Sequence, residues 1–301
     1  MMPLESKVFK KVLIIGVGLI GGSFALGLKR AAMVQQVVAW ERSPEALQRA
    51  LELGIIDQAA TDLAQAMAGA DLIVLAAPVA QTGPILRAIA PYLEAHSIVT
   101  DCGSTKQDVV RVAYEELGTR VAQFVPAHPI AGRESNGPDA AIVSLFEGKK
   151  VVLTPLPENS QAACDKVALA WQACGAIIHQ LSPFEHDRVF AAVSHLPHFL
   201  AFGLVDLLAR QEHAPQLFAY AASGFRDFTR IAASSPEMWR DISLANQTAL
   251  MHELDAYLAQ LHSMRIALQA GDGAQLHALY ANAQAARQNW QKTIEAAEKP
   301  Q

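Results

Sequence analysis

Cysteine, charge and, over one long stretch, lysine are scarce in this sequence. The three cysteines, Cys102, Cys164 and Cys174, are odd in number and form no CxxC pair, so we expect buried thiols in a reducing compartment, not a disulfide framework. Only 18% of the residues are charged and the net charge is -5, which argues against a nucleic-acid partner. No lysine lies between Val167 and Gln291, so that part can offer only histidine as a base and arginine as an anion clamp.

Signals for export and for a membrane span are also missing. The first residues lead into a strand-like run without an apolar stretch of signal-peptide length, so we expect a cytoplasmic protein. The apolar stretch 189–209 contains two histidines, a proline and an aspartate, which a membrane span tolerates poorly. We therefore expect a buried helix there and no membrane partner.

Residues 10–181 alternate short aliphatic runs with helical stretches, which is typical of a parallel sheet with crossover helices. The predicted strands are 11–15, 36–40, 72–76, 97–101, 123–127, 150–153 and 177–180. Ligands of open α/β sheets bind beyond the carboxyl ends of the strands. We therefore expect the functional site at the loops that follow these strands.

A glycine turn with the sequence GVGLIG follows the first predicted strand and opens a helical stretch. Gly16 permits the tight turn, Gly18 lets the backbone approach a pyrophosphate, and Gly21 lets the helix pack closely on the sheet. The helix begins at Leu19 and Ile20, where its N-terminal amides can donate to phosphate. In this context the pattern predicts a bound nicotinamide dinucleotide.

The choice between NAD and NADP depends on the end of the second strand. Glu41 follows Gly21 by 20 residues and is placed to hold the ribose hydroxyls of the adenosine, which favours NAD. Arg42 could receive the 2′-phosphate of NADP, and Ser43 fits a phosphate ligand as well as it fits a helix N-cap. We expect NAD, with NADP left open, bound by a Rossmann-type domain over residues 1–181.

The second part of the chain has a helical pattern throughout. Ser182 and Glu185, with a proline between them, form a capping-box pattern that predicts the start of a long helix. Beyond it no β-run is convincing, Ser235 offers a second N-cap, and residues 271–273 offer a break. We expect an all-α domain over residues 182–301, whose broad apolar faces predict a homodimer formed through it.

Chemistry-bearing residues gather in three clusters. They are residues 127–134 (AHPIAGRE), 194–198 (SHLPH) and 224–232 (GFRDFTRIA). With residues 101–106 and 238–241, these clusters resemble the prephenate/arogenate dehydrogenase family in order and spacing, over nearly all of residues 10–290. The missing lysine argues against the β-hydroxyacid and 6-phosphogluconate dehydrogenases, which share the two-domain plan but carry a catalytic lysine on the long helix.

The resemblance implies an enzyme that oxidises prephenate or arogenate at C4 of the cyclohexadienyl ring and releases the ring carboxylate as CO₂. His128 matches the family's catalytic histidine, which draws off the hydroxyl proton; a reference pKa of about 6.5 leaves it mostly neutral at cytosolic pH. Arg230 matches the arginine that anchors a substrate carboxylate. Ser104 matches a serine that contacts the substrate oxygen.

The resemblance also implies the residues around the substrate. His198 and Trp239 match residues that line the pocket, while Glu134 and Asp227 match acids that pair with arginines near its mouth. The two acids fit an ordinary solvated ion pair equally well. His195 and His198 share one helix face, but no acidic or cysteine partner lies at a ligand spacing, so no metal is expected.

Two alternatives stay open. Another NAD(P)-dependent dehydrogenase of a small carboxylic acid would share the same two-domain plan, and a non-catalytic dinucleotide sensor would bind cofactor without turnover. The sequence does not separate prephenate from arogenate as the substrate, because one carboxylate clamp serves both.

Overall fold

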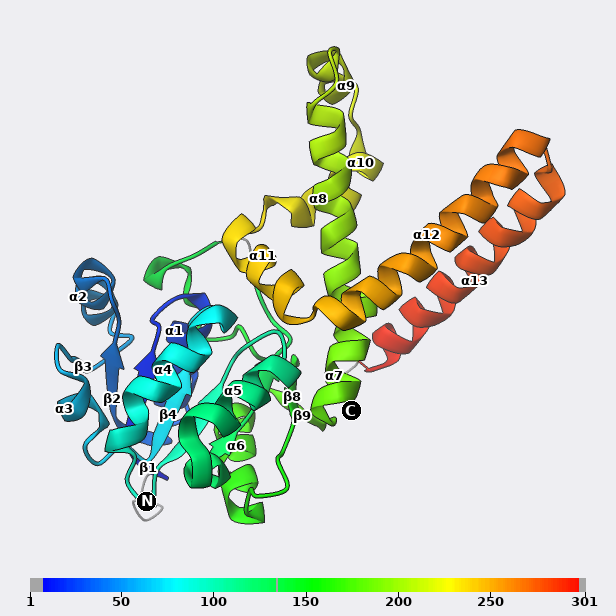
Figure 1. The fold of residues 1–301 in the computed structure, drawn as a ribbon. Helices are drawn as coiled ribbons and strands as arrows, with labels where there is room; N and C mark the ends of the chain where they lie inside the picture. The colour runs from blue at the N-terminus through cyan, green and yellow to red at the C-terminus, as the bar shows by residue number, and fades with distance from the viewer. Residues whose placement is uncertain (1–7, 134, 298–301) are drawn as a thin grey trace. The chain divides into compact units, whose positions relative to one another are not determined.

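The computed structural model describes residues 8–133 and 135–297, and the chain divides into two compact units, Met1–Gln247 and Thr248–Gln301. The strands are β1 (Phe9–Ile15), β2 (Val34–Trp40), β3 (Gln58–Ala59), β4 (Leu72–Leu75), β5 (Ile98–Asp101), β6 (Phe124–Val125), β7 (Ala127–Pro129), β8 (Lys150–Leu153) and β9 (Ile177–Gln180). The α-helices of the first unit before residue 182 are α1 (Leu19–Arg30), α2 (Pro44–Glu52), α3 (Leu63–Met67), α4 (Thr82–Ile89), α5 (Gln107–Leu117) and α6 (Gln161–Ala173) (Figure 1).

The remaining α-helices are α7 (Pro183–Phe190), α8 (Leu196–Ala209), α9 (Ala214–Ala219), α10 (Ser223–Thr229), α11 (Pro236–Ala245), α12 (Gln247–Ala270) and α13 (Gly273–Ala297). Short helical turns lie between them: η1 (Val79–Gln81), η2 (Ala90–Tyr92), η3 (Gly118–Gln123), η4 (Pro138–Ala140), the π-helical η5 (Ala191–His195) and η6 (Arg230–Ala233).

The main sheet has six parallel strands in the order β3-β2-β1-β4-β5-β6. Along β1 the side chains alternate between two buried clusters, as the period of a strand requires. Val12 and Ile14 belong to the cluster that also holds residues of α1, α2 and α6, and Leu13 and Ile15 to the cluster with residues of α3, α4 and α5. Helices therefore cover both faces of the sheet, and the expected Rossmann-type fold is confirmed.

The prediction of one continuous parallel sheet is wrong for its last strands. β7, β8 and β9 form a second sheet, in which β7 runs antiparallel to β8 and β9 parallel to it. The predicted strand 123–127 breaks at Pro126, which has no backbone N–H to donate to the β6 ladder. Beyond the break, the amide of Ala127 donates to the side chain of Asp101 at 3.0 Å. The two-residue strand β3 was too short to predict.

The capping box at Ser182 is formed as predicted, with reciprocal hydrogen bonds between Ser182 and Glu185. From there to residue 297, every regular element that the structure describes is a helix. The expectation of a buried helix at 189–209 is wrong for the single chain, since only 22% of the most apolar stretch of Pro183–Ala209 is buried. This helix is long and apolar enough to cross a membrane by length and composition alone, which is weak evidence for a span.

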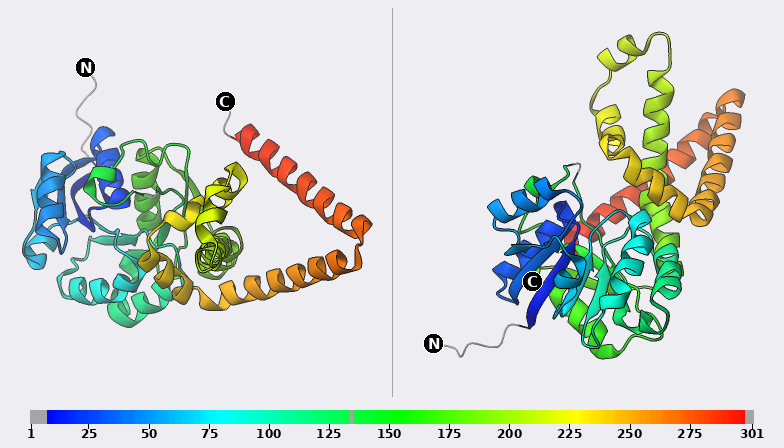
Figure 2. Two further views of the ribbon diagram at one scale, coloured as in Figure 1. Left: turned by 90° about the horizontal axis from the view of Figure 1, so that it is seen from above. Right: turned by 60° about the vertical axis from the view of Figure 1, so that its left-hand side comes forward.

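The second unit consists of the rest of α12 and α13, which diverge from the turn at Gly271 (Figure 2). Gly271 has a positive φ of 66°, so the predicted break at residues 271–273 is confirmed. Several large apolar side chains of this unit are exposed, including Leu268 at 71% and Tyr280 at 56%. The predicted domain boundary between residues 181 and 182 stays a prediction, because compactness divides the chain elsewhere.

Candidate active site

The glycine turn is built as its sequence predicts. Gly16 has a φ of +100°, and a Cβ there would lie 2.7 Å from the carbonyl oxygen of Ala76. A Cβ at Gly21 would lie 2.2 Å from the carbonyl oxygen of Gly16. At Gly18, by contrast, a Cβ would meet no protein atom within 4 Å. Gly16 and Gly21 are therefore required by packing inside the chain, whereas Gly18 keeps space open in front of the turn.

A cavity of about 330 Å³ lies beyond the carboxyl ends of β1 and β2 and is lined by the glycine turn. Glu41 and Arg42 line it on one side and Pro78 and Gln81 on the other. The carboxylate of Glu41 accepts hydrogen bonds from the amide of Val17 at 3.4 Å and from that of Arg42 at 2.7 Å. These bonds hold the acid beside the turn, where a ribose would lie.

Ser43 is the N-cap of α2, because its hydroxyl accepts a hydrogen bond from the amide of Ala46 at 3.1 Å. The same hydroxyl donates to Glu45 at 2.7 Å. The N-cap interpretation is therefore confirmed, and a phosphate-binding role for Ser43 stays a prediction. The side chain of Arg42 is exposed at the rim of the cavity.

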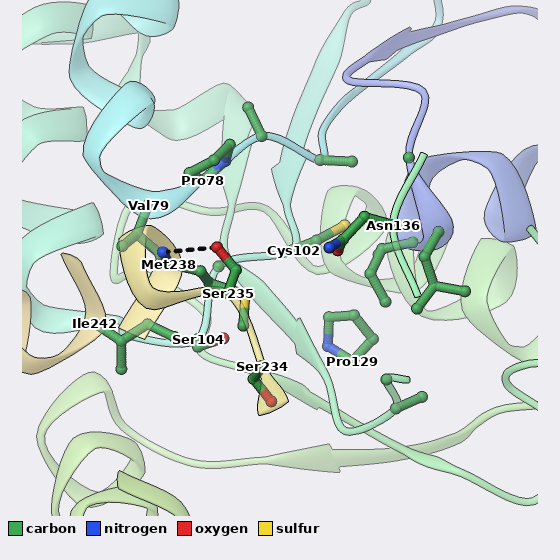
Figure 3. Close-up of a pocket in the computed structure, with 18 of the residues that line it drawn as sticks. Pro78, Val79, Cys102, Ser104, Pro129, Asn136, Ser234, Ser235, Met238 and Ile242 are labelled. Carbon is green, nitrogen blue, oxygen red and sulfur yellow. Dashed lines mark hydrogen bonds between the residues drawn. The ribbon is translucent and has the colours of Figure 1, made fainter. Parts of the chain in front are cut away.

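A second cavity, of about 370 Å³, shares its wall with the first, since Gly18 and residues 76–78 line both. Ser104, His128 and Cys102 line it from the ends of β5 and β7, and Ser234, Ser235 and Met238 close it from the helical part (Figure 3). Leu19 and Ile20, at the start of α1, also line this second cavity. Glu41 lines one of these adjacent cavities and His128 the other, an arrangement that suits a dinucleotide and an adjoining substrate.

His128 is held by a buried chain of polar side chains. Its Nδ1 lies 2.8 Å from Nε2 of His186, and Nδ1 of His186 lies 2.8 Å from a carboxylate oxygen of Asp187. His186 and Asp187 are both fully buried. Phe190 packs against both imidazoles, with ring centroids 4.9 Å from His128 and 4.5 Å from His186. The ring of His128 is therefore held in one orientation at the cavity wall.

The pKa of His128 lies well below its ordinary value of 6.5. Burial is the largest cause, and the neighbouring His186, Lys106 and His195 lower it further. Each disfavours a positive charge on the ring. His128 is therefore neutral at neutral pH, and a neutral imidazole can accept a proton.

A buried ion pair supports the two loops that carry Ser104 and His128. Lys106 and Asp101 are paired and almost completely buried. The carboxylate of Asp101 also accepts from the amide of Gly103 at 2.8 Å and from that of Ala127 at 3.0 Å. Each of these amides belongs to the residue directly before a predicted site residue. The pair thus connects the end of β5 to the start of β7.

The remaining predicted site residues that the structure describes line neither cavity. His198 stacks on Trp239, with ring centroids 3.6 Å apart, and burial and the charge of Arg230 lower the pKa of His198. Arg230 begins η6 and Asp227 lies in α10, both with exposed side chains. Glu134 lies outside the described residues. The structure thus brings His198 near Trp239 and Arg230, but not against His128.

Sequence reasoning missed His186, Asp187, Lys106 and Asn246. Asn246 donates to the carbonyl of Asp187 at 2.8 Å and lies 3.1 Å from Nδ1 of His195. No local motif marks His186, Asp187 and Asn246, because the contacts that join them to the site come from elements far apart in the chain. Lys106 lies in the 101–106 cluster, but its buried pairing with Asp101 was not predicted. A polar pair within the first two turns of a long helix was the available signal for His186 and Asp187.

The described residues contain no group of three or more histidine, cysteine or acidic side chains that could hold a metal ion. Cys164 and Cys174 are buried and Cys102 is partly exposed at the cavity, and all three are free thiols. The prediction of buried thiols is therefore confirmed for two of the three.

Comparison with known proteins gives a consistent result over the length of the chain. Residues 24–180 match the sequence model of the prephenate dehydrogenase nucleotide-binding domain, and residues 182–282 match that of the prephenate dehydrogenase dimerization domain. The chain belongs to the prephenate dehydrogenase family. The glycine turn precedes the first matched range, so the assignment of residues 16–21 depends on their geometry.

Individual relatives within the family agree with this. The chain is 37% identical to a cyclohexadienyl dehydrogenase from Zymomonas mobilis over 93% of this chain and 96% of that protein. A prephenate dehydrogenase from A. aeolicus, solved with hydroxyphenyl propionate and NAD+, superposes with a TM-score of 0.89 at 36% identity and covers 95% of this chain and 99% of that one. Synechocystis arogenate dehydrogenase superposes with a TM-score of 0.78 at 28% identity, over 93% and 99% of the two chains. The expected family, fold class and oxidoreductase class are confirmed.

Proposed function

We propose that the chain catalyses the NAD-dependent oxidative decarboxylation of prephenate, of arogenate, or of both. The observation that carries the proposal is that His128, whose pKa is lowered by burial, lies at the wall of a cavity that shares lining residues with the nucleotide cavity. Prephenate would give 4-hydroxyphenylpyruvate and arogenate would give tyrosine, each with release of CO₂. Both reactions need a base for a hydroxyl proton beside an electron acceptor.

The residues of the first cavity fit the dinucleotide. Gly18 leaves room for a pyrophosphate, α1 begins without a side-chain cap and so has free amides to donate, and Glu41 faces the ribose position. NAD, when bound, would accept a hydride from C4 of the substrate. We propose NAD over NADP, because the carboxylate of Glu41 would repel a 2′-phosphate.

In the proposed reaction His128 accepts the C4 hydroxyl proton at Nε2. The loss of this proton and of the hydride leaves a carbonyl at C4. CO₂ then departs and leaves its bonding electron pair in the ring, which gives an aromatic phenolate, and return of the proton from His128 gives the phenol. Ser104 lines the same cavity, and its hydroxyl is proposed to hydrogen-bond the reacting oxygen. Because the pKa of His128 is lowered, the base stays available as the pH falls through 6.5.

Arg230 is proposed to anchor a carboxylate of the substrate through its planar fork. His198 and Trp239, which are stacked on one another, would form the pocket wall beside it, and Asp227 would orient the arginine. Glu134 keeps the same proposed role at the pocket mouth. Because Arg230 and Asp227 are exposed in the single chain, a second subunit would complete this part of the pocket.

We also propose a homodimer formed through the helical part, in a cytoplasmic protein. The second matched model is described as a dimerization domain, and the long helix Pro183–Ala209 leaves apolar side chains such as Val193 and Leu207 exposed. Burial of these faces against a second copy would remove them from water.

The decisive experiment measures formation of reduced nicotinamide by the purified protein with prephenate and with arogenate, each supplied with NAD and with NADP. Turnover with NAD and either substrate is the expected result. Cofactor binding with no turnover in any mixture would favour the sensor alternative, and turnover of another small acid would favour the other dehydrogenase. The Glu41→Ala variant should lower the preference for NAD over NADP; an unchanged ratio of kcat/KM would remove Glu41 from that role.

A further inference from the structure

The second nitrogen of His128 is used by the protein in a way that no sequence motif indicates. Its Nδ1 faces Nε2 of His186 across 2.8 Å, while no hydrogen bond to Nε2 of His128 exists within the described residues. We propose that His186 and Asp187 are positioning residues that hold His128 in the tautomer with the proton on Nδ1 and a bare Nε2. This proposal rests on the proposed function, since it concerns His128 as the base.

Asp187 ends the series of hydrogen bonds that runs from His128 through His186. Its carboxylate accepts hydrogen bonds from the amides of Lys106 at 2.8 Å and Gln107 at 2.9 Å, from the side chain of Gln107 at 3.3 Å, and from His186. Burial acts to raise the pKa of Asp187, but the hydrogen bonds from His186 and from the two amides outweigh it and the pKa is lowered. Asp187 is therefore an ionised carboxylate, which can only accept.

The ionised carboxylate of Asp187 determines which nitrogen donates in each hydrogen bond of the series. Because Asp187 only accepts, Nδ1 of His186 must carry a proton and donate it. Burial lowers the pKa of His186 despite the favourable carboxylate, so the ring is neutral and its Nε2 is a bare acceptor. His128 must then donate from Nδ1 to that nitrogen. The neutral ring of His128 has one proton, so its Nε2 is left without one and can take a proton from a substrate hydroxyl.

The groups around His128, His186 and Asp187 offer no other hydrogen-bonding pattern that satisfies all three side chains. His186 and Asp187 are 0% exposed, so water does not replace either partner. The other charged and titratable groups near His128 are the ammonium of Lys106, which is paired with Asp101, and the neutral His195, whose pKa burial lowers to about 4. Neither accepts a hydrogen bond from Nδ1 of His128. A histidine ordered by a carboxylate in this way is the logic of hydrolase triads, extended here by one imidazole.

The first test reads the tautomer directly, in the protein without cofactor or substrate. In a chain labelled with ¹⁵N-histidine, the resonances of His128 are assigned from their loss in the His128→Asn variant. We expect the shift of a protonated nitrogen at Nδ1 and of an unprotonated one at Nε2. A proton on Nε2 as the main form would overturn the proposal, whatever the enzyme turns over.

The second test uses two replacements of His186 that are close in size. In His186→Gln the side-chain oxygen can accept from His128 and the amide can donate to Asp187, whereas His186→Met can do neither. We expect the Met variant to lose kcat by about 10- to 100-fold with little change in the KM of the substrate. The Gln variant should retain most of kcat and the Nδ1-protonated tautomer.

Equal losses of kcat in the two variants would overturn the proposal, since they would show that bulk alone matters at this position. The exposed His179 supplies a matched control, and His179→Met should leave kcat unchanged. If the Met variant fails to fold, the tautomer in the wild type and in the Gln variant still decides. A wild type that shows the expected tautomer but turns over neither substrate would refute the proposed function. The positioning role of His186 and Asp187 would still be supported.

Discussion

The α/β part of the chain and the helical part that follows it differ in how far they bury their apolar side chains. Before residue 182 several of the largest side chains are fully buried, among them Trp171, Phe24 and Phe146. After it, Val193 is 67% exposed, Leu207 60% and Leu268 71%. The first part closes its core within one chain, because helices cover both faces of its main sheet. The second part keeps apolar surface that a single chain does not cover, which a monomeric protein rarely does.

This difference assigns separate tasks to the two parts. The closed part, together with the buried side chains of His186 and Asp187 at the start of the helical part, supplies the low-dielectric surroundings in which His128 keeps one hydrogen-bonding pattern. The open part carries Arg230 and Trp239, which are proposed to be completed by a second copy of the chain. Damage to the first part should therefore appear in the chemical step or in folding, and damage to the second in assembly.

The largest expected effect is in the closed part. His128→Asn should lower kcat by roughly 10²- to 10⁴-fold, because the variant lacks a base for the hydroxyl proton. Arg230→Ala should instead mainly raise KM, as expected of an anchor. Steady-state kinetics with both variants measures this split. The reverse pattern would exchange the two roles, and unchanged NAD affinity in His128→Asn serves as the control for folding.

The second effect tests the open part. Val193→Glu should convert a dimer into monomers, with the dissociation constant raised by about 100-fold or more, since each interface would bury two unpaired charges. Sedimentation velocity over a range of concentrations measures the change. Leu169→Glu, at a residue that is 41% exposed in the α/β part, is the matched control and should not alter assembly. A monomeric wild type would refute the proposed dimer.

The third effect separates packing from ligand binding within the glycine turn. Gly21→Ala should lower the free energy of unfolding by about 1–3 kcal/mol, because its Cβ would lie 2.2 Å from the carbonyl oxygen of Gly16. Gly18→Ala should cost less than about 1 kcal/mol of stability but weaken NAD binding, because its Cβ points into the open cavity. Urea unfolding and NAD titration test the pair. Equal losses of stability would contradict this division of roles.

The smallest effect is the pH dependence of stability caused by the buried histidines of both parts. The folded chain lowers the pKa of His128, His186 and His195 below 6.5, the last to about 4. Between the folded and unfolded values the unfolded state binds more protons, so stability falls as the pH drops below 6.5. Each histidine should contribute a slope of up to about 1.4 kcal/mol per pH unit.

Urea unfolding at several pH values between neutral and mildly acid measures this slope, and His195→Gln should make it shallower. Stability that does not fall in this interval would show that the three histidines are not held neutral by the fold.

The glycine turn was predictable to individual residues, and the arrangement around the proposed base was not. The positions of Gly16, Gly18 and Gly21 are tied to one strand, one turn and one helix, so a local pattern specifies them. Glu41 follows from the end of the next strand. At Pro126, however, the chain leaves the main sheet and enters the second one. The antiparallel pairing of β7 was not predicted, because its partner β8 lies more than twenty residues further on.

By itself the sequence determined the glycine turn, the capping box at Ser182, the helical character of the second part and the family resemblance that singles out His128. The first three depend on neighbours within a turn, a strand or a helix, where local geometry decides, and the resemblance depends on the order and spacing of clusters along residues 10–290. Only the tertiary structure decided that Asp101 and Lys106 support both site loops and that His186 and Asp187 stand behind His128. Those contacts join residues as many as 81 positions apart, so no local pattern encodes them. Because they are buried, each donor must keep its own acceptor, and the direction of each hydrogen bond is set.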